Sequence, residues 1–437
     1  MCGKDDPARR DERHIVITIV STNPTAANTR DLTIDSVGAQ GDGLSADHLF
    51  VALTLPGERV RVEVHGDRAE ALDILQPSPD RTLPACPHFG DCGGCALQHW
   101  ASGPYLAWKA EQIRVALGRE RIETEILTPF AAPPGARRRL ALHARREGGA
   151  VRLGFKARRS WRLVDIEVCP ISEPALVVAL PALRALAGPF LEHAKSAPTL
   201  HVTWTLSGLD VEVTGVERKS GGLSADARQR AAKAAAAGDM ARVTMAGETI
   251  YQARQPVVRL GPATVALPPG AFLQAVAAAE AAMAEFAVEA IGAAVRVADL
   301  YCGVGAFTFR LARTAAVHAA DASAPAVKAL IAATGTASGL KPITAEARDL
   351  SRRPLLAMEM KKLDAVVFDP PRAGALEQSG EIGRSKVATA VGVSCNPTTF
   401  ARDARTLIDA GFLLEKVLPV DQFLWSPHVE LVGVFRR

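Results

Sequence analysis

The chain has 437 residues, of which 48% are hydrophobic and 22% are charged, and its formal net charge at pH 7 is +4. This composition is that of a globular protein with roughly two to four domains, and it excludes disordered, collagen-like and disulfide-scaffold proteins. No apolar run reaches the ~18 residues of a membrane-spanning helix, and the charged segment Met1–His14 lacks the apolar core of a secretion signal. We expect a cytoplasmic monomer without a membrane partner.

The first predicted domain, residues 10–78, is a small β-barrel. Short alternating segments at His14–Val20, Leu49–Leu53 and Val60–Val64 are separated by glycine-rich turns, which is typical of β-strands. Barrels of the OB type often bind single-stranded nucleic acid, and the alternative is a structural spacer.

The cysteines are unevenly placed. Cys86, Cys92 and Cys95 lie close together, whereas Cys2, Cys169, Cys302 and Cys395 are solitary. An odd number of cysteines in a cytoplasmic chain argues against disulfide bonds.

The second predicted domain, residues 79–265, is mixed α+β and carries a basic surface. A helix is predicted at Tyr105–Gly118, and a second stretch, Ala231–Gly238, is alanine-rich and helix-prone. Between Arg137 and Arg162 ten basic residues occur with a single acid, in strands that turn at Gly148-Gly149. A solvated face normally mixes both signs of charge, so this run favours binding of phosphate groups. It opens with the three candidate substrate ligands Arg137, Arg138 and Arg139.

The third predicted domain, residues 266–437, alternates helices with short apolar strands. A helix is expected at Phe272–Ile291, and strands at Val295–Leu300, Val317–Ala320, Ala365–Phe368, Ala390–Ser394 and Leu431–Phe435. Near-continuous apolar strands are typical of a parallel sheet covered on both faces. The fold class is therefore α/β and doubly wound, with ligands at the carboxyl ends of the strands.

The first of these strands leads into a glycine-rich turn. Gly303 and Gly305 allow the backbone to approach a ligand before a short helix, Thr308–Arg313, and Asp321 ends the next strand, where a carboxylate suits ribose hydroxyls. The third glycine of the dinucleotide fingerprint is replaced by Thr308. A nucleoside such as S-adenosylmethionine therefore fits better than a dinucleotide.

Two further strand ends carry reactive side chains. Asp369-Pro-Pro-Arg372 places Asp369 over the expected cofactor, with Arg372 as a phosphate or carboxylate partner or as an ordinary surface arginine. Asn396 and Pro397 suit the start of a helix, so Cys395 lies beside a helix N-terminus, where the dipole favours a thiolate.

Near the carboxyl terminus, His428 and Glu430 alternate onto one face of an extended segment. This spacing permits an acid–base pair.

Together these segments resemble the RNA 5-methyluridine (uracil-C5) methyltransferase family over nearly the whole chain. The resemblance is carried by Cys86-x5-Cys-x2-Cys95 with Cys169, Phe272-Leu-Gln274, Asp299-Leu-Tyr-Cys-Gly-Val-Gly305, Asp369-Pro-Pro-Arg-Ala-Gly374, Ser394-Cys-Asn-Pro-Thr398 and His428-Val-Glu430. The barrel resembles the TRAM domain of that family, with Gly41-Asp-Gly43 and Leu55-Pro-Gly-Glu58 as the matching turns.

The resemblance implies a class I S-adenosylmethionine-dependent methyltransferase domain and a covalent mechanism. Cys395 would add to C6 of a uracil, which makes C5 reactive toward the methyl group, and Glu430 would then remove the C5 proton. The expected contacts to S-adenosylmethionine are Gln274, Tyr301, Gly303, Gly305, Ala306, Asp321, Asp349 and Asp369, and those to RNA include Arg372 and His428. Two positions depart from the family pattern, since Ala306 replaces a common asparagine and Leu424 replaces a proline.

In one branch of the family, the positions of Cys86, Cys92, Cys95 and Cys169 ligate a [4Fe–4S] cluster. Zinc is the alternative occupant of four thiolates. We expect the group to organise the middle domain and to take no part in methyl transfer. The cluster-bearing branch resembles enzymes of 23S ribosomal RNA, so this RNA is the expected partner, with the target uracil flipped out of its stack.

Three alternatives remain open on the sequence. One is a transfer RNA substrate for the same chemistry. A second is amino-group methylation, which is marked by an aromatic residue after Asp-Pro-Pro, whereas position 372 is arginine. A third is a metal-stapled RNA-binding protein with an inactive methyltransferase fold.

Overall fold

The computed structural model describes residues 28–217 and 222–437. The chain divides into two compact units, Met1–Arg81 and Thr82–Arg437. The predicted strand His14–Val20 and the start of the predicted barrel domain lie outside the described residues. No helix in the described ranges is long and apolar enough to cross a membrane.

The first unit is a closed five-stranded barrel with the strand order β1-β2-β3-β5-β4, which confirms the predicted small barrel. Its strands are β1 (Thr29–Val37), β2 (Gly43–Ser45), β3 (Phe50–Val51), β4 (Arg59–His65) and β5 (Arg68–Gln76). Alternate residues such as Ile34, Val60 and Val62 point inward and are fully buried. The predicted strand Leu49–Leu53 is shorter than expected, because Leu53 has a positive φ of 62° that ends the extended backbone.

The middle part of the second unit is a seven-stranded sheet with the order β10-β9-β8-β11-β12-β13-β14. The strands are β8 (Arg139–Glu147), β9 (Ala150–Lys156), β10 (Leu163–Asp165), β11 (Thr199–Thr205), β12 (Gly208–Thr214), β13 (Arg242–Met245) and β14 (Glu248–Gln252). Three helices share its apolar core: α2 (Pro174–Val178), α3 (Leu180–Phe190) and α4 (Ala225–Ala237). The turn predicted at Gly148-Gly149 joins β8 to β9, and the alanine-rich stretch lies in α4, whose first turn is capped by Ser224.

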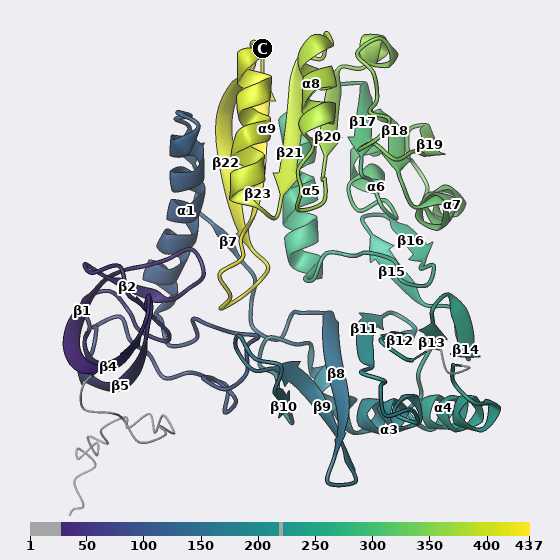
Figure 1. Cartoon of the computed structure of the whole chain (residues 1–437). Coiled ribbons are helices and arrows are strands. Elements are labelled where there is room, and N and C mark those ends of the chain that lie inside the picture. The colour runs from purple at the N-terminus through teal and green to yellow at the C-terminus, as the bar shows by residue number, and fades with distance from the viewer. Residues whose placement is uncertain (1–27, 218–221) are drawn as a thin grey trace, which may run out of the picture. The chain divides into compact units, whose positions relative to one another are not determined.

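The remainder of the second unit is built on a nine-stranded sheet with the order β19-β18-β17-β20-β21-β23-β22-β6, and β7 also pairs with β22 (Figure 1). The strands are β6 (Glu125–Ile126), β7 (Phe130–Ala131), β17 (Arg296–Leu300), β18 (Ala316–Asp321), β19 (Ile343–Ala347), β20 (Ala365–Phe368), β21 (Thr389–Ser394), β22 (Leu413–Asp421) and β23 (Glu430–Arg436). Strands β17 to β21 are parallel and β23 is antiparallel to β21. A short ribbon of β15 (Val257–Leu260) and β16 (Ala263–Ala266) precedes this sheet in the chain.

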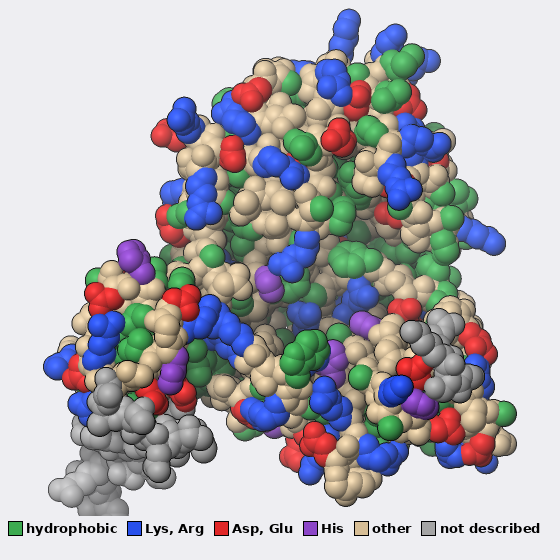
Figure 2. Space-filling model, viewed as in Figure 1, with side chains coloured by type: hydrophobic (Ala, Val, Ile, Leu, Met, Phe, Trp, Pro, Cys, Tyr) green, Lys and Arg blue, Asp and Glu red, His purple; other side chains and the backbone are tan. Residues whose placement is uncertain are grey.

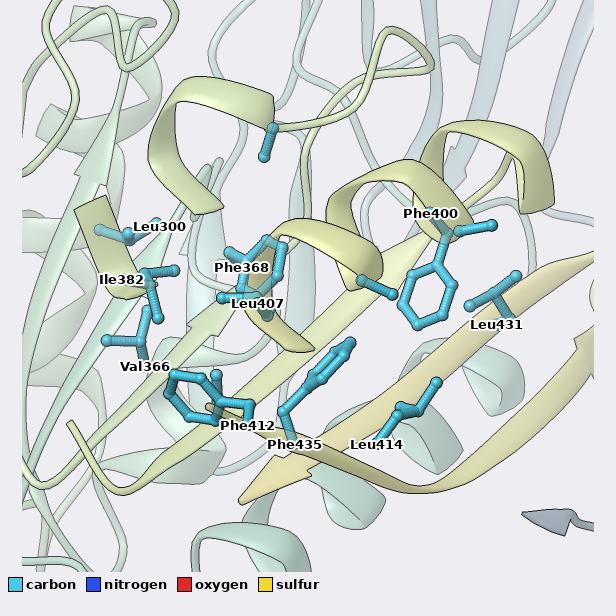
Figure 3. Close-up of a cluster of buried hydrophobic side chains, with 14 of the residues drawn as sticks. Leu300, Val366, Phe368, Ile382, Phe400, Leu407, Phe412, Leu414, Leu431 and Phe435 are labelled. Carbon is cyan, nitrogen blue, oxygen red and sulfur yellow. The ribbon is translucent and has the colours of Figure 1, made fainter. Parts of the chain in front are cut away.

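Helices cover both faces of the nine-stranded sheet, as a doubly wound fold requires. They are α1 (Ser102–Arg119), α5 (Ala277–Ile291), α6 (Thr308–Leu311), α7 (Ala324–Ala333), α8 (Leu376–Arg384) and α9 (Pro397–Asp409). One core joins α1, α8 and α9 to the sheet, and Figure 3 shows Phe368 beside Leu407 and Phe400 beside Leu431 within it. A second core joins α5 and α6 to the sheet. The predicted α/β class is confirmed.

Two features of this sheet differ from the sequence prediction. The helix predicted at Phe272–Ile291 begins only at Ala277, because the preceding backbone is extended and its Leu273, Gln274 and Ala275 carbonyls accept hydrogen bonds from the middle domain. In addition, α1, β6 and β7 precede the middle sheet in the chain yet pack on or pair within the nine-stranded sheet. The pairing therefore crosses the boundary suggested at residue 265.

Candidate active site

The glycine-rich turn after β17 forms the first wall of the candidate site. Tyr301, Gly303 and Gly305 all have positive φ, and a Cβ atom at Gly305 would lie 2.5 Å from the ring of Phe309. The N–H of Gly303 donates to Asp321 Oδ2 at 2.9 Å. This turn can therefore bring backbone close to a ligand at the carboxyl end of β17.

The expected cofactor ligands after β18 and β19 each accept a hydrogen bond from a serine in the following turn. Asp321 ends β18, and its Oδ1 accepts the N–H of Ser323 at 2.7 Å. Asp349 follows β19, is exposed, and accepts the Ser351 hydroxyl, a hydrogen bond that lowers the pKa of this carboxyl. The small side chain of Ala306 is partly exposed, and its carbonyl accepts a hydrogen bond from Arg310.

The turn is held by a buried carboxyl, Asp299, for which the sequence predicted no separate role. Asp299 is completely buried in β17 and accepts the Thr308 hydroxyl at 2.5 Å. Burial raises the pKa of Asp299 to about 7, and the charges of Asp369 and Asp321 add to the effect.

A chain of amide side chains links two further carboxyls. Gln274 donates to Asp369 Oδ2 at 3.0 Å, and Gln422 donates to Gln274 Oε1 at 2.6 Å and to Glu430 Oε1 at 2.9 Å. Burial, followed by the charge of Asp369, raises the pKa of Glu430 to about 8. Burial also raises the pKa of Asp369 to about 7, although part of the residue is exposed. The pKa values of Asp369 and Glu430 therefore lie close to neutral pH, as does that of Asp299.

Cys395 follows β21, beside the N-terminus of α9. Asn396 caps that helix by accepting the N–H of Thr398 at 3.1 Å, and Pro397 is its first residue, as predicted. The expected lowering of the thiol pKa is wrong for this state of the protein. Half-burial of the sulfur, followed by the charge of Glu430, raises the pKa of Cys395 to about 11, although Arg372 lowers it. Desolvation and nearby carboxylates outweigh the helix dipole here.

Arg372 and His428 lie exposed at the mouth of the site. The Arg372 Nη2 atom is 3.4 Å from His428 Nδ1. Partial burial of the ring, followed by the charge of Arg372, lowers the pKa of His428. The lowered pKa favours a neutral imidazole beside the arginine at neutral pH.

The segment between β22 and β23, residues 422–429, is called the terminal loop, and Glu430 follows it as the first residue of β23. Lys109 of α1 is completely buried, forms an ion pair with Asp421, and donates to the carbonyls of Phe423 and His428 at 3.2 Å and 2.6 Å. Burial lowers the pKa of Lys109 to about 8, although the charge of Asp421 raises it. A fixed cation from a distant helix thus holds both ends of the loop.

The cysteine segment contacts the same loop. The N–H groups of Ala96 and Leu97 both donate to the carbonyl of Trp425, at 2.8 Å and 3.0 Å. Lys109 and these backbone bonds were not predicted, since nothing in the sequence around residues 96–109 marks them as partners of residues 421–430.

The four candidate metal-ligating cysteines line one hollow of about 310 Å³, and its wall also includes Arg137, Phe423 and His428. The cysteines are Cys86, Cys92, Cys95 and Cys169. Burial raises the pKa of the first three thiols, to about 12 for Cys95, and the charge of Cys169 adds to each effect. Among the described residues no three His, Cys, Asp or Glu side chains converge closely enough to hold a metal ion as they stand.

The three candidate arginines have different surroundings. Arg138 is 5% exposed and pairs with Glu280 at 2.7 Å, so it is removed from the candidate RNA contacts and becomes a buried link to α5. Arg137 and Arg139 line a hollow of about 210 Å³ beside Gln274. Within the described ranges neither forms an ion pair, and burial lowers the pKa of both guanidinium groups. Figure 2 shows basic and hydrophobic side chains around the recess between the two sheets of this unit.

The chain is similar in sequence to known RNA methyltransferases. Residues 264–437 match the family model described as tRNA (uracil-5-)-methyltransferase. An uncharacterized RNA methyltransferase of Caulobacter vibrioides is 68% identical over 93% of this chain and 100% of the relative. The 23S rRNA (uracil(1939)-C(5))-methyltransferase RlmD of Halomonas elongata is 34% identical over 92% of this chain and 88% of its own.

The fold itself matches a solved structure. The tRNA (uracil-54, C5)-methyltransferase of Pyrococcus abyssi, in complex with S-adenosyl-L-homocysteine, superposes with a TM-score of 0.70 at 23% identity, over 93% of this chain and 99% of the other. The shared fold is that of a class I methyltransferase.

Proposed function

The chain belongs to the RNA uracil-C5 methyltransferase family, and we propose that it methylates C5 of a uracil in 23S ribosomal RNA through a covalent bond between Cys395 and C6. The observation that carries the mechanism is the convergence of Cys395, Glu430 and Asp369 at neighbouring strand ends, where the charge of each carboxylate acts on the thiol. The relative named for 23S rRNA, which aligns over most of both chains, supports the substrate.

S-adenosylmethionine supplies the methyl group, and the residues that fit it are Tyr301, Gly303, Gly305, Asp321, Asp349, Asp369 and Gln274, with Ala306 contributing backbone only. The open turn after β17, where Gly305 leaves no room for a side chain, and the carboxylates after β18 and β19 suit a nucleoside. These positions lie at one edge of the sheet, together with Cys395.

The chain's own residues perform the remaining chemistry. The thiolate form of Cys395 bonds to C6 and pushes electron density to C5, which would then bond to the methyl carbon as the bond between that carbon and the cofactor sulfur breaks. Glu430 takes the C5 proton, the C5–C6 double bond re-forms, and the carbon–sulfur bond breaks to release the thiolate. The target base must first leave its stack, at a cost of a few kcal/mol that contacts with the surrounding RNA offset.

Product analysis tests the activity and its substrate. Purified protein is incubated with labelled S-adenosylmethionine and either 23S ribosomal RNA or transfer RNA, and the RNA is digested to nucleosides. We expect label in 5-methyluridine from ribosomal RNA. The transfer RNA substrate named by the family model is the second candidate. Label in that RNA alone would exclude the ribosomal assignment, and label on a base nitrogen would exclude the mechanism.

We propose that the cysteine hollow holds a [4Fe–4S] cluster, with zinc as the alternative occupant. A zinc ion draws four sulfurs to about 2.3 Å from one point. One hollow of about 310 Å³ is lined by Cys86, Cys92, Cys95 and Cys169, which supports a group held by four thiolates. Bound thiolates would tie the segment at residues 86–95 to the middle domain.

Metal analysis after anaerobic purification checks this assignment. We expect a brown protein with ~4 iron and ~4 sulfide per chain, and loss of both in Cys169→Ser because one thiolate ligand is removed. Cys302→Ser is the matched control, since Cys302 lies outside the hollow, and it should keep the full iron content. A colourless protein with one zinc per chain would contradict the proposal.

Arg137 and Arg139 are proposed to bind RNA phosphates at the mouth of the site. Burying an unpaired guanidinium is costly, so a bound anion would stabilise both residues. Replacing both with glutamine should weaken RNA binding. The slope of log K against log salt should fall by about 1 for each phosphate group that the variant no longer neutralises.

Fluorescence titration of RNA at several salt concentrations measures that slope, with the exposed Arg119→Gln at the end of α1 as the control. Equal slopes for the double variant and the control would show that these arginines do not contact RNA phosphates.

A further inference from the structure

The carboxamide of Gln422 lies at the centre of the amide chain between the two site carboxyls. It is 2% exposed, and its Nε2 donates to both Gln274 and Glu430. Its Oε1 accepts the N–H of Ala275 at 3.0 Å. All three polar contacts of this side chain are therefore made inside the protein.

The backbone N–H of Ala275 fixes which way this carboxamide faces. A backbone N–H can only donate, so it must meet the oxygen of Gln422 and leave the NH₂ group facing Gln274 and Glu430. Gln274 in turn presents its oxygen to Gln422 and its NH₂ group to Asp369. Each carboxyl therefore faces an N–H donor in this network.

This polarity favours the ionised form of both carboxyls. The groups around Glu430 are Asp369 after β20, Arg372 in the following turn and Cys395 after β21, and only Arg372 is cationic. Burial and Asp369 favour the protonated acid, so the donor from Gln422 is a main counterweight. Glu430 Oε1 accepts that donor, and within the described structure Oε2 makes no hydrogen bond, which leaves it for a substrate proton.

We propose that Gln422 is a positioning residue that favours the ionised form of Glu430 and aims its free oxygen at the C5 proton of the methylated adduct. The inference rests on the proposed function and concerns its last step only. In that step the proton moves from C5 to Oε2, the C–H electron pair forms the C5–C6 double bond, and the C6–S pair leaves with Cys395. Formation of the adduct does not require this proton transfer.

Gln422→Met tests the proposal, because methionine is similar in length but has no N–H donor. Adduct formation should change less than about twofold. Release of methylated RNA should slow about 10- to 100-fold, as expected for losing a hydrogen bond to a charged group, so a gel-stable protein–RNA adduct accumulates during turnover. The acid limb of the release rate should move to higher pH by about one unit or more. Gln252→Met, an exposed glutamine in β14, is the matched control.

A second variant is used if Gln422→Met does not fold into the native structure. Binding of S-adenosylhomocysteine by calorimetry and the Tm report whether Gln422→Met is native-like. If it is not, Gln422→Glu keeps the shape and can accept the Ala275 N–H but offers no donor, so its release should be slower than that of the wild type with the pH limb displaced further. Wild-type release and pH profile in a variant that binds S-adenosylhomocysteine would overturn the proposal. A wild-type protein that forms no 5-methyluridine would instead overturn the proposed function.

Discussion

Replacing Cys395 with alanine should lower 5-methyluridine formation by about 10⁴-fold or more, below detection in most assays, because the sulfur that bonds to C6 is removed. RNA binding and S-adenosylhomocysteine binding should persist, since the side chain is only half-buried and its truncation disturbs little packing. Labelled methyl transfer to RNA, measured in single turnover, checks the loss. Cys302→Ala serves as the control for removal of a thiol from the same domain.

RNA that carries 5-fluorouridine gives a direct view of the same bond. Fluorine cannot leave as a proton does, so the wild-type protein should remain attached to the RNA in a denaturing gel. The Cys395→Ala variant should give no such band. Adduct formation by the alanine variant, or its absence from the wild type, would refute the covalent mechanism.

The second large effect is expected from Glu430→Gln. An amide has nearly the same shape as the carboxylate but cannot take the C5 proton, so kcat should fall by roughly 10²- to 10⁴-fold. Attack and methyl transfer precede this step, so methylated RNA should stay bonded to Cys395. Mass spectrometry of the trapped complex should find the methyl group already in place. An unmethylated adduct would assign Glu430 to an earlier step.

The pH dependence of release follows from the surroundings of Glu430. Burial and the charge of Asp369 raise the pKa of this carboxyl to about 8, and only the ionised form accepts the proton. Release should therefore quicken with rising pH below about 8 and level off above it, with about a tenth of the carboxyl ionised at pH 7. Single-turnover decay of the adduct across this range measures the profile, and a rate that falls with rising pH would contradict the role of a base.

Local patterns predicted the parts of the site that follow buried strands. Asp321, Asp369 and Cys395 each come at or directly after the end of an apolar segment, and a parallel sheet brings such ends to one edge. The cap at Asn396 was also visible, because side-chain capping depends on neighbours in the chain.

Contacts between distant segments could not be predicted in the same way. Arg138 belongs to a basic run but is buried against Glu280, and Gln422 and Lys109 have ordinary surroundings in the sequence. The pKa of Cys395 likewise depends on carboxylates from other strands, which the helix N-terminus alone does not reveal. Tertiary packing decides these cases.

Helix α1 packs on the nine-stranded sheet, and β6 and β7 pair within it, although all three precede the seven-stranded sheet in the chain. The seven-stranded sheet is therefore an insertion within the methyltransferase fold. During synthesis α1, β6 and β7 leave the ribosome long before β22, the strand with which β6 and β7 pair. The ion pair between Lys109 and Asp421 likewise forms only after Asp421 has been made. The edge of the nine-stranded sheet can therefore form only after β22 has been made. A truncated fragment that begins at residue 266 would lack β6 and β7 at this edge. We therefore expect this sheet to be completed only after β22 has been synthesised.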